Sequence, residues 1–398
     1  MTPRSIVFVV PELLPVPAVR GGAVEHWVDV VSAKMRHPGR RLAVVSRPAE
    51  TPGTEGIEYI PIRWTKAERV FQSLKDRVTW RNPLRYLAKI QNVTAYGLRV
   101  AHAVRDFDLI YIHNEPNLLG FIRPRPNQRV VLHMHNDHLR ARPLRPLYRR
   151  LLRRASVVLF VSDYVRKRAA DVFPESSGRF ATILNGTDPE TFRPYGPTAV
   201  EALRGRIEID NKYTYLLYAG RLTPIKGVHI LIEAFRELRI RWPDLRLIIV
   251  GSSFFEGATR TPYEDRLLEL VKPMLSAVAF TGYIDHAALK YLYSAVDVVV
   301  VPSIWQEPCG LVVLEAMASG TCIVATGVGG TPELVDQEVN GLLVEPDDAH
   351  AMAEAIHRVL ADPSLKERLE AAARQRAQAV FTWDRVVQQI EATFASLT

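Results

Sequence analysis

The sequence predicts an α/β protein built from two doubly wound domains that face each other across a cleft. Three observations support this fold class. The chain has 398 residues, which is too many for one compact core. Runs rich in Val, Ile and Leu alternate with amphipathic stretches in both halves, as in βαβ units. These runs show little polar alternation, which is typical of parallel strands buried on both faces.

Apolar runs of strand length occur in both halves of the chain. In the first half, strands are predicted at residues 5–10, 41–46, 108–113, 129–135 and 156–162. In the second half, they are predicted at residues 213–220, 245–251, 278–282, 296–302, 322–326 and 341–346. Surface helices are predicted over 350–378, and residues 51–56 are predicted to form a loop.

The domain boundary is predicted near the middle of the chain. We assign residues 1–195 to an N-terminal domain and residues 205–380 to a C-terminal domain. The hinge is expected within 190–212, where ETFRPYGPTAV carries two prolines and a glycine. Residues 381–398 are expected to form a helix that packs back on the N-terminal domain. The carboxyl ends of both sets of strands should line the cleft, because doubly wound sheets bind ligands there.

Charge is distributed unevenly along the chain. Residues 1–195 contain 32 Lys and Arg against 17 Asp and Glu, a net charge of +15, and residues 196–398 carry −7. The two halves are therefore expected to meet different partners. Two cysteines, Cys309 and Cys322, provide neither a disulfide framework nor a cysteine metal cluster and indicate a reducing compartment. The sequence contains no apolar run long enough for a membrane span, and its first one is too short for a signal peptide.

Two carboxylates flank an apolar stretch in SIWQEPCGLVVLEAMASG, residues 303–320. The pattern predicts a loop that follows a strand and carries Glu307. A helix that carries Glu315 and ends at Gly320 is predicted after this loop. The N–H groups of Gly310, Leu311 and Val312 would open that helix and attract an anion such as a phosphate. The alternative is a surface helix with two solvated acids, and the spacing alone does not decide between them.

Two cations follow a strand in YAGRLTPIKGVHILIEAF, residues 218–235. Arg221 and Lys226 at this edge could neutralise a diphosphate leaving group. The alternative is a pair of surface charges on a loop.

Candidate groups also follow strands of the first half. Gly21 and Gly22 are expected to open a helix whose N-terminus could bind an anion. The alternative is that the two glycines form an ordinary turn. His133 should lie in the sheet as a structural residue, whereas His135 lies at the end of its strand. The preceding strand ends at His113 and Asn114, which lie at the same predicted ligand-binding edge.

The sequence Asp106-Phe107-Asp108 is a D-x-D pattern, which can bind a metal. It precedes its strand and should lie at the edge of the sheet away from the cleft. We therefore interpret it as a turn at the strand entry and predict neither a catalytic metal nor a cofactor.

The segment E-P-C-G-L-V-V-L-E resembles the E-x7-E motif of retaining glycosyltransferases of the family 4 type, which have the GT-B fold of two Rossmann-like domains. The resemblance implies that Glu307 binds the hydroxyls of the donor sugar and that Glu315 binds the ribose of the nucleotide. Residues 218–227 resemble the G-R-L-x-x-x-K-G motif, which implies that Arg221 and Lys226 bind the diphosphate.

The resemblance extends over nearly the whole chain and implies further roles. The Gly-rich loop with Gly22 would close over the phosphates, and His135 would bond a hydroxyl of the donor sugar. Residues 184–194 resemble the N-G-V-D-x-x-x-F signature, with a structural role, and 328–335 resemble a G-G-x-x-E-x-V element beside the donor. The assigned donor side consists of Glu315, Gly310, Leu311, Val312, Gly22, Gly21, Gly220 and Gly251.

The implied reaction moves a hexose or N-acetylhexosamine from a nucleotide-diphosphate sugar to a hydroxyl of a glycan, a lipid-linked or a small-molecule acceptor. The family implies retention at the anomeric carbon and favours uridine as the base. No side chain in the sequence stands out as a covalent nucleophile, which favours a front-face path, and no metal is predicted. Some segments are similar to the spore-coat and cell-envelope polysaccharide branch. Alternatives are a sugar-nucleotide epimerase and a non-catalytic sugar-nucleotide-binding protein of an envelope or coat. A dehydrogenase is disfavoured because the G-x-G-x-x-G fingerprint is missing.

The first half would bind the acceptor, with His113 and Asn114 as candidate residues on the acceptor side. Its segment 139–156 contains seven arginines interspersed with Leu and Tyr. This segment could dock on an anionic membrane surface or hold a lipid-diphosphate acceptor, or it could be a solvated helix face. Nucleic acid is not expected, because no binding motif accompanies the charge. The expected location is cytoplasmic, with peripheral attachment to the inner face of the membrane as an option.

Overall fold

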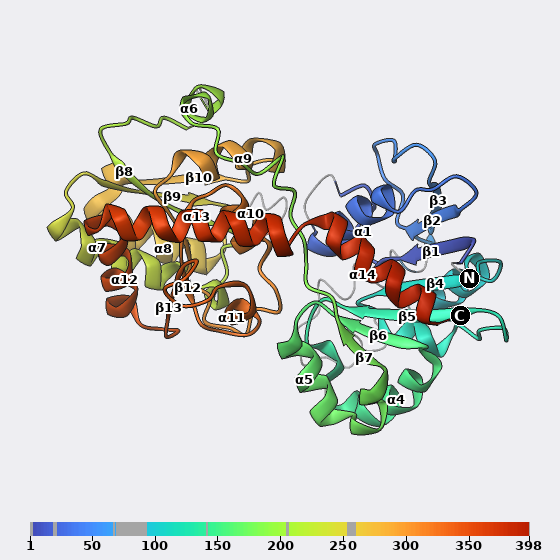
Figure 1. Ribbon diagram of the computed structural model, residues 1–398. Coiled ribbons are helices and arrows are strands. Elements are labelled where there is room, and N and C mark those ends of the chain that lie inside the picture. The colour runs from blue at the N-terminus through green and yellow to red at the C-terminus, as the bar shows by residue number, and fades with distance from the viewer. Residues whose placement is uncertain are drawn as a thin grey trace. The chain divides into compact units, whose positions relative to one another are not determined.

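The computed structural model describes most of the chain as two compact units (Figure 1). The described residues are 3–18, 22–66, 68, 94–140, 142–203, 207–252 and 260–397. The first unit comprises Met1–Leu184 with Val386–Thr398, and the second comprises Asn185–Arg385. The predicted hinge at 190–212 thus belongs to the second unit, where residues Pro197–Leu203 form helix α6.

The first unit is built on a parallel sheet of seven strands in the order β3-β2-β1-β4-β5-β6-β7. The strands are β1 (Ser5–Val9), β2 (Arg41–Ser46), β3 (Glu58–Pro61), β4 (Leu109–His113), β5 (Arg129–Met134), β6 (Val157–Phe160) and β7 (Phe180–Thr182). The labelled helices are α1 (Ala23–Lys34), α4 (Arg145–Leu151), α5 (Asp163–Val172) and α14 (Trp383–Ser396), with short 3-10 turns η1 (Pro116–Gly120), η2 (His138–Arg140), η3 (Arg142–Leu144), η4 (Leu152–Arg154) and η5 (Pro174–Arg179).

The C-terminal part of α14 packs on the first sheet (Figure 1). The ring of Phe394 meets Tyr111 of β4 edge-on at 5.3 Å between centroids. Arg40 forms an ion pair with Glu391 of this helix, and the Arg129 guanidinium donates to the carbonyl of Leu397 at 2.7 Å. The end of the chain is therefore tied to the unit in which the chain begins.

Asp108 of the D-x-D pattern ties two strand starts together. Its carboxylate accepts hydrogen bonds from the backbone N–H of Arg4 at 3.1 Å and of Ser5 at 2.9 Å, and the Ser5 hydroxyl accepts from the N–H of Asp108. Asp106 lies 3.8 Å from Arg125 in an exposed pair. Both contacts lie at the amino ends of β1 and β4, so Asp108 works as the strand-entry residue that the sequence predicts.

The second unit is built on a parallel sheet of six strands in the order β10-β9-β8-β11-β12-β13. The strands are β8 (Thr214–Ala219), β9 (Leu245–Val250), β10 (Val278–Gly282), β11 (Val298–Val301), β12 (Cys322–Thr326) and β13 (Leu342–Val344). Besides α6, the helices are α7 (Val228–Arg241), α8 (Pro262–Val271), α9 (His286–Ala295), α10 (Leu311–Ala318), α11 (Thr331–Leu334), α12 (Ala349–Ala361) and α13 (Pro363–Val380), with 3-10 turns η6 (Pro224–Lys226) and η7 (Lys272–Ala277).

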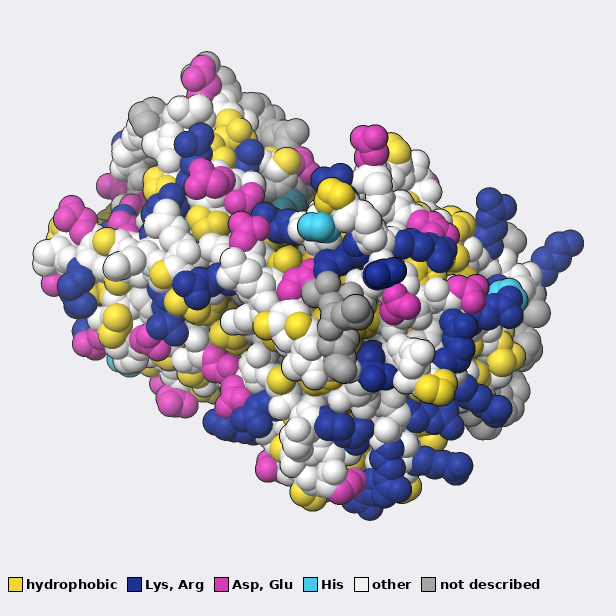
Figure 2. Space-filling model, turned by 45° about the vertical axis from the view of Figure 1, so that its right-hand side comes forward, with side chains coloured by type: hydrophobic (Ala, Val, Ile, Leu, Met, Phe, Trp, Pro, Cys, Tyr) yellow, Lys and Arg dark blue, Asp and Glu magenta, His cyan; other side chains and the backbone are white. Residues whose placement is uncertain are grey.

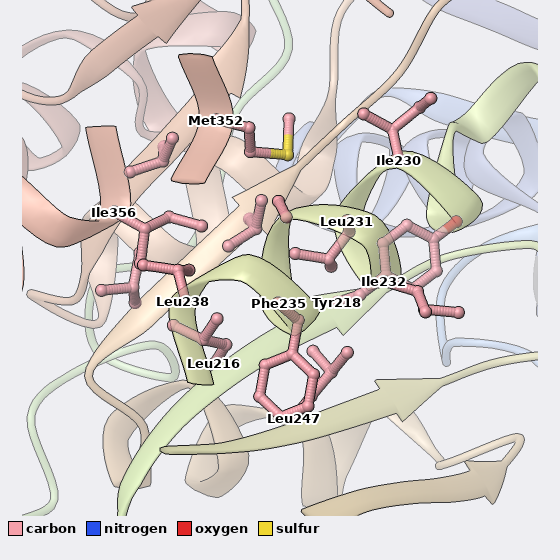
Figure 3. Packing of buried hydrophobic residues seen from close by; sticks show 14 of the residues in the cluster. Leu216, Tyr218, Ile230, Leu231, Ile232, Phe235, Leu238, Leu247, Met352 and Ile356 are labelled. Carbon is pink, nitrogen blue, oxygen red and sulfur yellow. The ribbon is translucent and has the colours of Figure 1, made fainter. Parts of the chain in front are cut away.

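Helix α7 covers one face of the second sheet and forms much of its core (Figure 3). Leu231, Phe235 and Leu238 recur with helical spacing and are fully buried. They belong to the same apolar cluster as Leu216 and Leu247 of the sheet and Met352 and Ile356 of α12. Full burial of one such side chain stabilises a fold by about 1.5–3 kcal/mol.

All of the predicted runs form strands, with ends that differ by up to two residues, and both predicted sheets are parallel. The fold class is confirmed. Two strands were missed, β3 and β7, which are the two edges of the first sheet. They are short and partly exposed, so they lack the continuous apolar run by which the central strands are recognised.

Truncation of Phe235 should destabilise the second unit. We expect Phe235→Ala to lower its free energy of unfolding by about 3–5 kcal/mol, because a buried aromatic ring leaves a cavity. Ile240→Ala on the same helix is the matched control, since Ile240 is 83% exposed, and it should change stability by less than about 0.5 kcal/mol. Denaturant unfolding of both variants measures this difference, and equal effects would contradict the packing described.

Candidate functional site

Glu307 and Lys226 meet at the carboxyl end of the second sheet. Glu307 lies in the loop between β11 and α10, and Lys226 ends η6 after β8. Their side chains form a close ion pair, with only 15% and 18% of the respective side chains exposed. The Ser303 hydroxyl donates to the same Glu307 oxygen at 3.3 Å. Two residues 81 positions apart in sequence, both predicted from the motifs, are thus brought together.

The backbone of Glu307 is held by the loop that follows β12. Its carbonyl accepts a hydrogen bond from the N–H of Gly330 at 2.7 Å, and the Gln306 side chain accepts from the N–H of Gly329 at 3.0 Å. Gly329 has φ +62°, and a Cβ at this position would collide with the Glu307 carbonyl. Only glycine suits both the backbone angle and the close approach. The G-G element therefore lies directly against the Glu307 loop.

Helix α10 begins beside this pair. Its N-cap is Gly310, and the N–H groups of Leu311 and Val312 lie in the first turn, where no intrahelical carbonyl can reach them. The partial positive charge of this helix end favours a negatively charged ligand. The predicted anion-binding end of the helix thus begins shortly after Glu307, whose side chain pairs with Lys226 at the same edge of the sheet.

Glu315 is turned into the protein, away from solvent. The residue is 6% exposed, and both of its oxygens accept hydrogen bonds, from His286 Nε2 at 2.8 Å and from the Tyr293 hydroxyl at 2.8 Å. Both donors belong to α9. Neither residue was predicted from the sequence, because neither lies in a motif with Glu315.

Arg221 and the two predicted glycines follow the strands β8 and β9. Arg221 is exposed, and its carbonyl accepts a hydrogen bond from the Tyr218 hydroxyl at 2.8 Å. Gly220 and Gly251 continue the strand edge, with N–H groups that donate to the carbonyls of Val250 at 3.0 Å and of Gly282 at 2.8 Å. These positions lie at the same edge of the sheet as Lys226.

The segment around Asn185 is structural, as its pattern predicts. The Asp188 carboxylate accepts from the N–H of Glu190 at 3.1 Å and from the Thr191 hydroxyl at 2.6 Å. The amide of Asn185 donates to the carbonyl of Cys309 at 3.4 Å. The N-G-T-D turn therefore supports the loop that carries Glu307.

In the first unit, histidines gather where β4 and β5 end. His113 and His133 are register partners, so their side chains lie on the same face of the sheet. His113 Nδ1 lies 3.0 Å from His135 Nε2, and His133 Nδ1 lies 2.9 Å from the Tyr111 hydroxyl. The ring of Trp27 from α1 packs against all three imidazoles, at 4.9 to 5.5 Å between centroids.

Desolvation keeps these imidazoles neutral. It lowers the pKa of His135 to about 3, and it lowers the pKa of His113 and His133 well below the ordinary value, with the nearby histidines adding to the effect. At neutral pH the three rings can therefore donate or accept one hydrogen bond at each nitrogen without carrying charge.

Asn114 connects the two strand ends. It has a left-handed φ of +59°, its N–H donates to the carbonyl of His133 at 2.8 Å, and its side-chain oxygen accepts from the N–H of His135 at 3.0 Å. The backbone around His135 is thus fixed by a side chain of the neighbouring strand. This contact gives Asn114 a structural task in addition to its predicted place on the acceptor side.

Two groups of side chains among the described residues could hold a metal ion. His113, His133 and His135 each place a ring nitrogen within 4.8 Å of the others, and Glu237, His350 and Glu354 do the same on the surface of the second unit. Three of the histidine nitrogens, His113 Nδ1, His133 Nδ1 and His135 Nε2, serve the hydrogen bonds just described, whereas Nε2 of His113 and of His133 is buried without a hydrogen-bond partner. The absence of a catalytic metal remains a prediction.

Helix α1 begins at the Gly-rich loop. Gly22 is its N-cap with φ +111°, and a Cβ there would collide with the carboxylate of Glu25, which folds back over the helix start. Gly21 lies outside the described residues. Burial raises the pKa of Glu25 to about 7, partly offset by a backbone hydrogen bond. No pattern in the sequence indicates that this carboxyl group is buried.

Comparison with known proteins identifies the family. Residues 21–191 match the family described as Glycosyltransferase Family 4, and residues 199–376 match the family Glycosyl transferases group 1. The chain is a glycosyltransferase of the family 4 type. The resemblance carried by the E-x7-E segment is thereby confirmed, and the two matches fall on the two units described above.

Relatives match this glycosyltransferase over nearly their whole length. YtcC of Bacillus subtilis, named as a glycosyltransferase, is 28% identical over 99% of this chain and 92% of its own. Spore coat protein SA of Bacillus subtilis is 25% identical over 97% of this chain and 98% of its own. The crystal structure of Anabaena HepE in complex with UDP-glucose superposes with a TM-score of 0.75, at 23% identity, over 98% of this chain and 99% of that one. This last likeness confirms the GT-B fold.

The buried Glu25 should make stability depend on pH. In the unfolded chain this carboxyl group releases its proton near pH 4.5, whereas the folded protein retains it up to about 7. The folded state therefore binds more protons between these values, and stability should fall as the pH rises through this window, by at most about 3 kcal/mol. We expect Glu25→Gln to remove this loss.

Unfolding midpoints measured at pH 5 and pH 8 test the expectation. Relative to the wild type, the unfolding midpoint of Glu25→Gln should be higher at pH 8 than it is at pH 5. Glu55→Gln is the matched control, because Glu55 lies exposed in the same unit, and it should follow the wild type at both values. A Glu25→Gln variant that also follows the wild type would show that the carboxyl group is not desolvated.

Proposed function

We propose that this protein transfers a hexose or N-acetylhexosamine from a nucleotide-diphosphate sugar, with uridine as the base, to a hydroxyl group and with retention at the anomeric carbon. The observation that carries the proposal is the Lys226–Glu307 pair beside the open end of α10. It combines a cation for the phosphates with a carboxylate for the sugar hydroxyls. The UDP-glucose bound to HepE supports the donor class.

In the proposed mechanism, Arg221 and Lys226 bind the diphosphate and stabilise the negative charge that develops as the glycosidic bond breaks. Glu307 accepts hydrogen bonds from the sugar hydroxyls, and Glu315 accepts from the ribose. On a front-face path, the leaving phosphate oxygen takes the proton of the acceptor hydroxyl, so no side chain needs to act as a nucleophile. The protein then contributes mainly positioning and charge stabilisation, without a metal.

His135 fits the role of a neutral hydrogen-bonding group for the donor sugar. Its backbone is fixed by Asn114, and its imidazole stays uncharged at neutral pH. A neutral ring can bond a hydroxyl group without competing with Lys226 and Arg221 for the phosphates. We place the acceptor on the first unit, near His113 and Asn114.

Loss of Lys226 should remove nucleotide binding. Uridine, guanosine and adenosine diphosphates and their sugars form the panel, and a ligand at 100 times its Kd stabilises the protein by about 2.7 kcal/mol. We expect one nucleotide to raise the Tm of the wild type and to have little effect on Lys226→Ala or Arg221→Ala. Lys272→Ala is the matched control, because Lys272 pairs with Glu269 on the surface of the same unit.

The products distinguish the proposed reaction from its alternatives. Glu307→Gln should bind the nucleotide but transfer sugar at least about a hundredfold more slowly, because the carboxylate that accepts hydrogen bonds from the sugar hydroxyls is lost. Retention requires that the donor and the product share one anomeric configuration, which NMR of the product reads directly. Inversion would contradict the proposal. Release of an epimerised sugar without an acceptor indicates an epimerase, and nucleotide binding without turnover indicates a binding protein.

We also propose that α4 and its flanking turns dock on an anionic membrane surface. Arg149, Arg150 and Arg153 are exposed here, and Leu144 and Leu147 are 37% and 46% exposed among them. Figure 2 shows Lys and Arg side chains gathered over the first unit. Basic side chains with exposed apolar neighbours suit the interface of an anionic bilayer. Among the described residues, no helix combines the length and hydropathy that crossing a membrane needs.

Vesicle sedimentation tests this surface. The protein should bind vesicles of phosphatidylcholine that contain phosphatidylglycerol and not vesicles of phosphatidylcholine alone. Replacing Arg150 and Arg153 by Ala should weaken binding about thirtyfold at low salt, because each cation near the surface contributes about 1 kcal/mol. A control with Arg358 and Arg368, on the second unit, replaced by Ala should bind like the wild type. Equal binding of the vesicles by the two double variants would contradict the assignment of this surface.

A further inference from the structure

Glu315 is held by two donors from one helix. His286 stands at the first position of α9 and Tyr293 two turns later, so both side chains project toward α10. One Glu315 oxygen accepts from His286 Nε2 and the other from the Tyr293 hydroxyl, each at 2.8 Å. The carboxylate is therefore fixed in orientation at both oxygens before any ligand arrives.

The two donors differ in their access to solvent. Tyr293 is fully buried, whereas 44% of the His286 side chain is exposed. The ring of Phe192 packs edge-on against His286 at 5.0 Å and against Tyr293 at 5.9 Å between centroids. Because His286 is partly exposed, replacing it should disturb the core less than replacing Tyr293. His286 is therefore the donor through which the orientation of Glu315 can be tested.

The charges that face His286 come from α9 and α10. Burial by itself would lower the pKa of His286, but its hydrogen bond to Glu315 and the charges of Glu315 and Asp285 raise it above the ordinary value. Asp285 also caps α9 by accepting from the N–H of Ala288 at 2.8 Å. The imidazole is therefore coupled to the carboxylate by geometry and by charge.

A carboxylate has about four lone-pair positions, of which His286 and Tyr293 occupy two. The remaining two can accept hydrogen bonds from the 2′ and 3′ hydroxyls of a ribose, and their directions are set by how the carboxylate is turned. We propose that His286 is a positioning residue that, through Glu315, makes the protein prefer a ribonucleotide over its 2′-deoxy counterpart. This inference rests on the proposed function, in which Glu315 binds the ribose.

Isothermal titration with uridine 5′-diphosphate and with 2′-deoxyuridine 5′-diphosphate tests the proposal on the full chain. The readout is the ratio of the two Kd values in wild type, His286→Leu and His286→Gln. We expect His286→Leu to reduce the preference for the ribonucleotide about tenfold, because one hydrogen bond to a charged group is lost, and to leave the affinity for the deoxynucleotide nearly unchanged. His286→Gln retains an N–H donor and should keep part of the preference.

The matched control is His350→Leu. His350 also pairs with a glutamate, Glu237, at 2.8 Å in the same unit, but on the outer side of α12 and α7. It should keep the wild-type ratio. Circular dichroism and the Tm of each variant verify that it folds.

The outcomes separate this inference from the proposed function. If no nucleotide of the panel binds the wild type, the proposed function is wrong. If the wild type binds but shows the same ratio as His286→Leu, or if Gln and Leu at position 286 lose the preference equally, the inference alone is overturned. NMR titration supplies a readout independent of nucleotide: the His286 ring should titrate above pH 6.5 in the wild type and at a lower pH in Glu315→Gln.

Discussion

The order of strands in the second sheet determines where its functional groups can meet. Strands β8, β11 and β12 are neighbours and parallel, so the segments that follow them leave the sheet at one edge. Lys226 follows β8, Glu307 follows β11 and Gly329 follows β12. Lys226 and Glu307 contact each other through the ion pair, and Gly329 and Gly330 contact the backbone of Glu307. A change of strand order would separate all of them.

The two units provide different electrostatic environments for a ligand. At the edge of the second sheet, a cation, a carboxylate and a helix N-terminus lie together, and the ionised groups satisfy one another. At the edge of the first sheet, desolvation keeps three imidazoles neutral. The first arrangement suits phosphates, and the second suits hydroxyl groups, which need hydrogen bonds but no counter-charge. The three imidazoles therefore add no charge at the ends of β4 and β5, although the first unit as a whole is basic.

The central strands and the motif residues could be predicted from the sequence, because each leaves a local signal. A buried parallel strand appears as a continuous apolar run, and Glu307 and Lys226 lie in motifs directly after such runs. The edge strands β3 and β7 leave no such signal, since they are short and their side chains are partly exposed to solvent. His286 and Tyr293 could not be linked to Glu315 from the sequence, because the packing of α9 on α10 joins positions 22 and 29 residues apart without any shared pattern. The same holds for Glu25, whose unusual environment arises from burial alone.

Glu307 and Glu315 belong to one motif, yet the structure prepares them for different tasks. Glu307 shares its charge with Lys226, and an ammonium group has three N–H donors, so Lys226 can retain this contact and still bond a phosphate oxygen. If Lys226 binds the diphosphate as proposed, the pair need not break. The phosphate would draw positive charge away from Glu307, which would strengthen Glu307 as an acceptor for hydroxyl groups. Glu315 has no such cation of fixed charge: its donors are a phenol and an imidazole. Its strength as an acceptor thus depends on orientation, so in the proposed function Glu315 would recognise the ribose by geometry more than by charge.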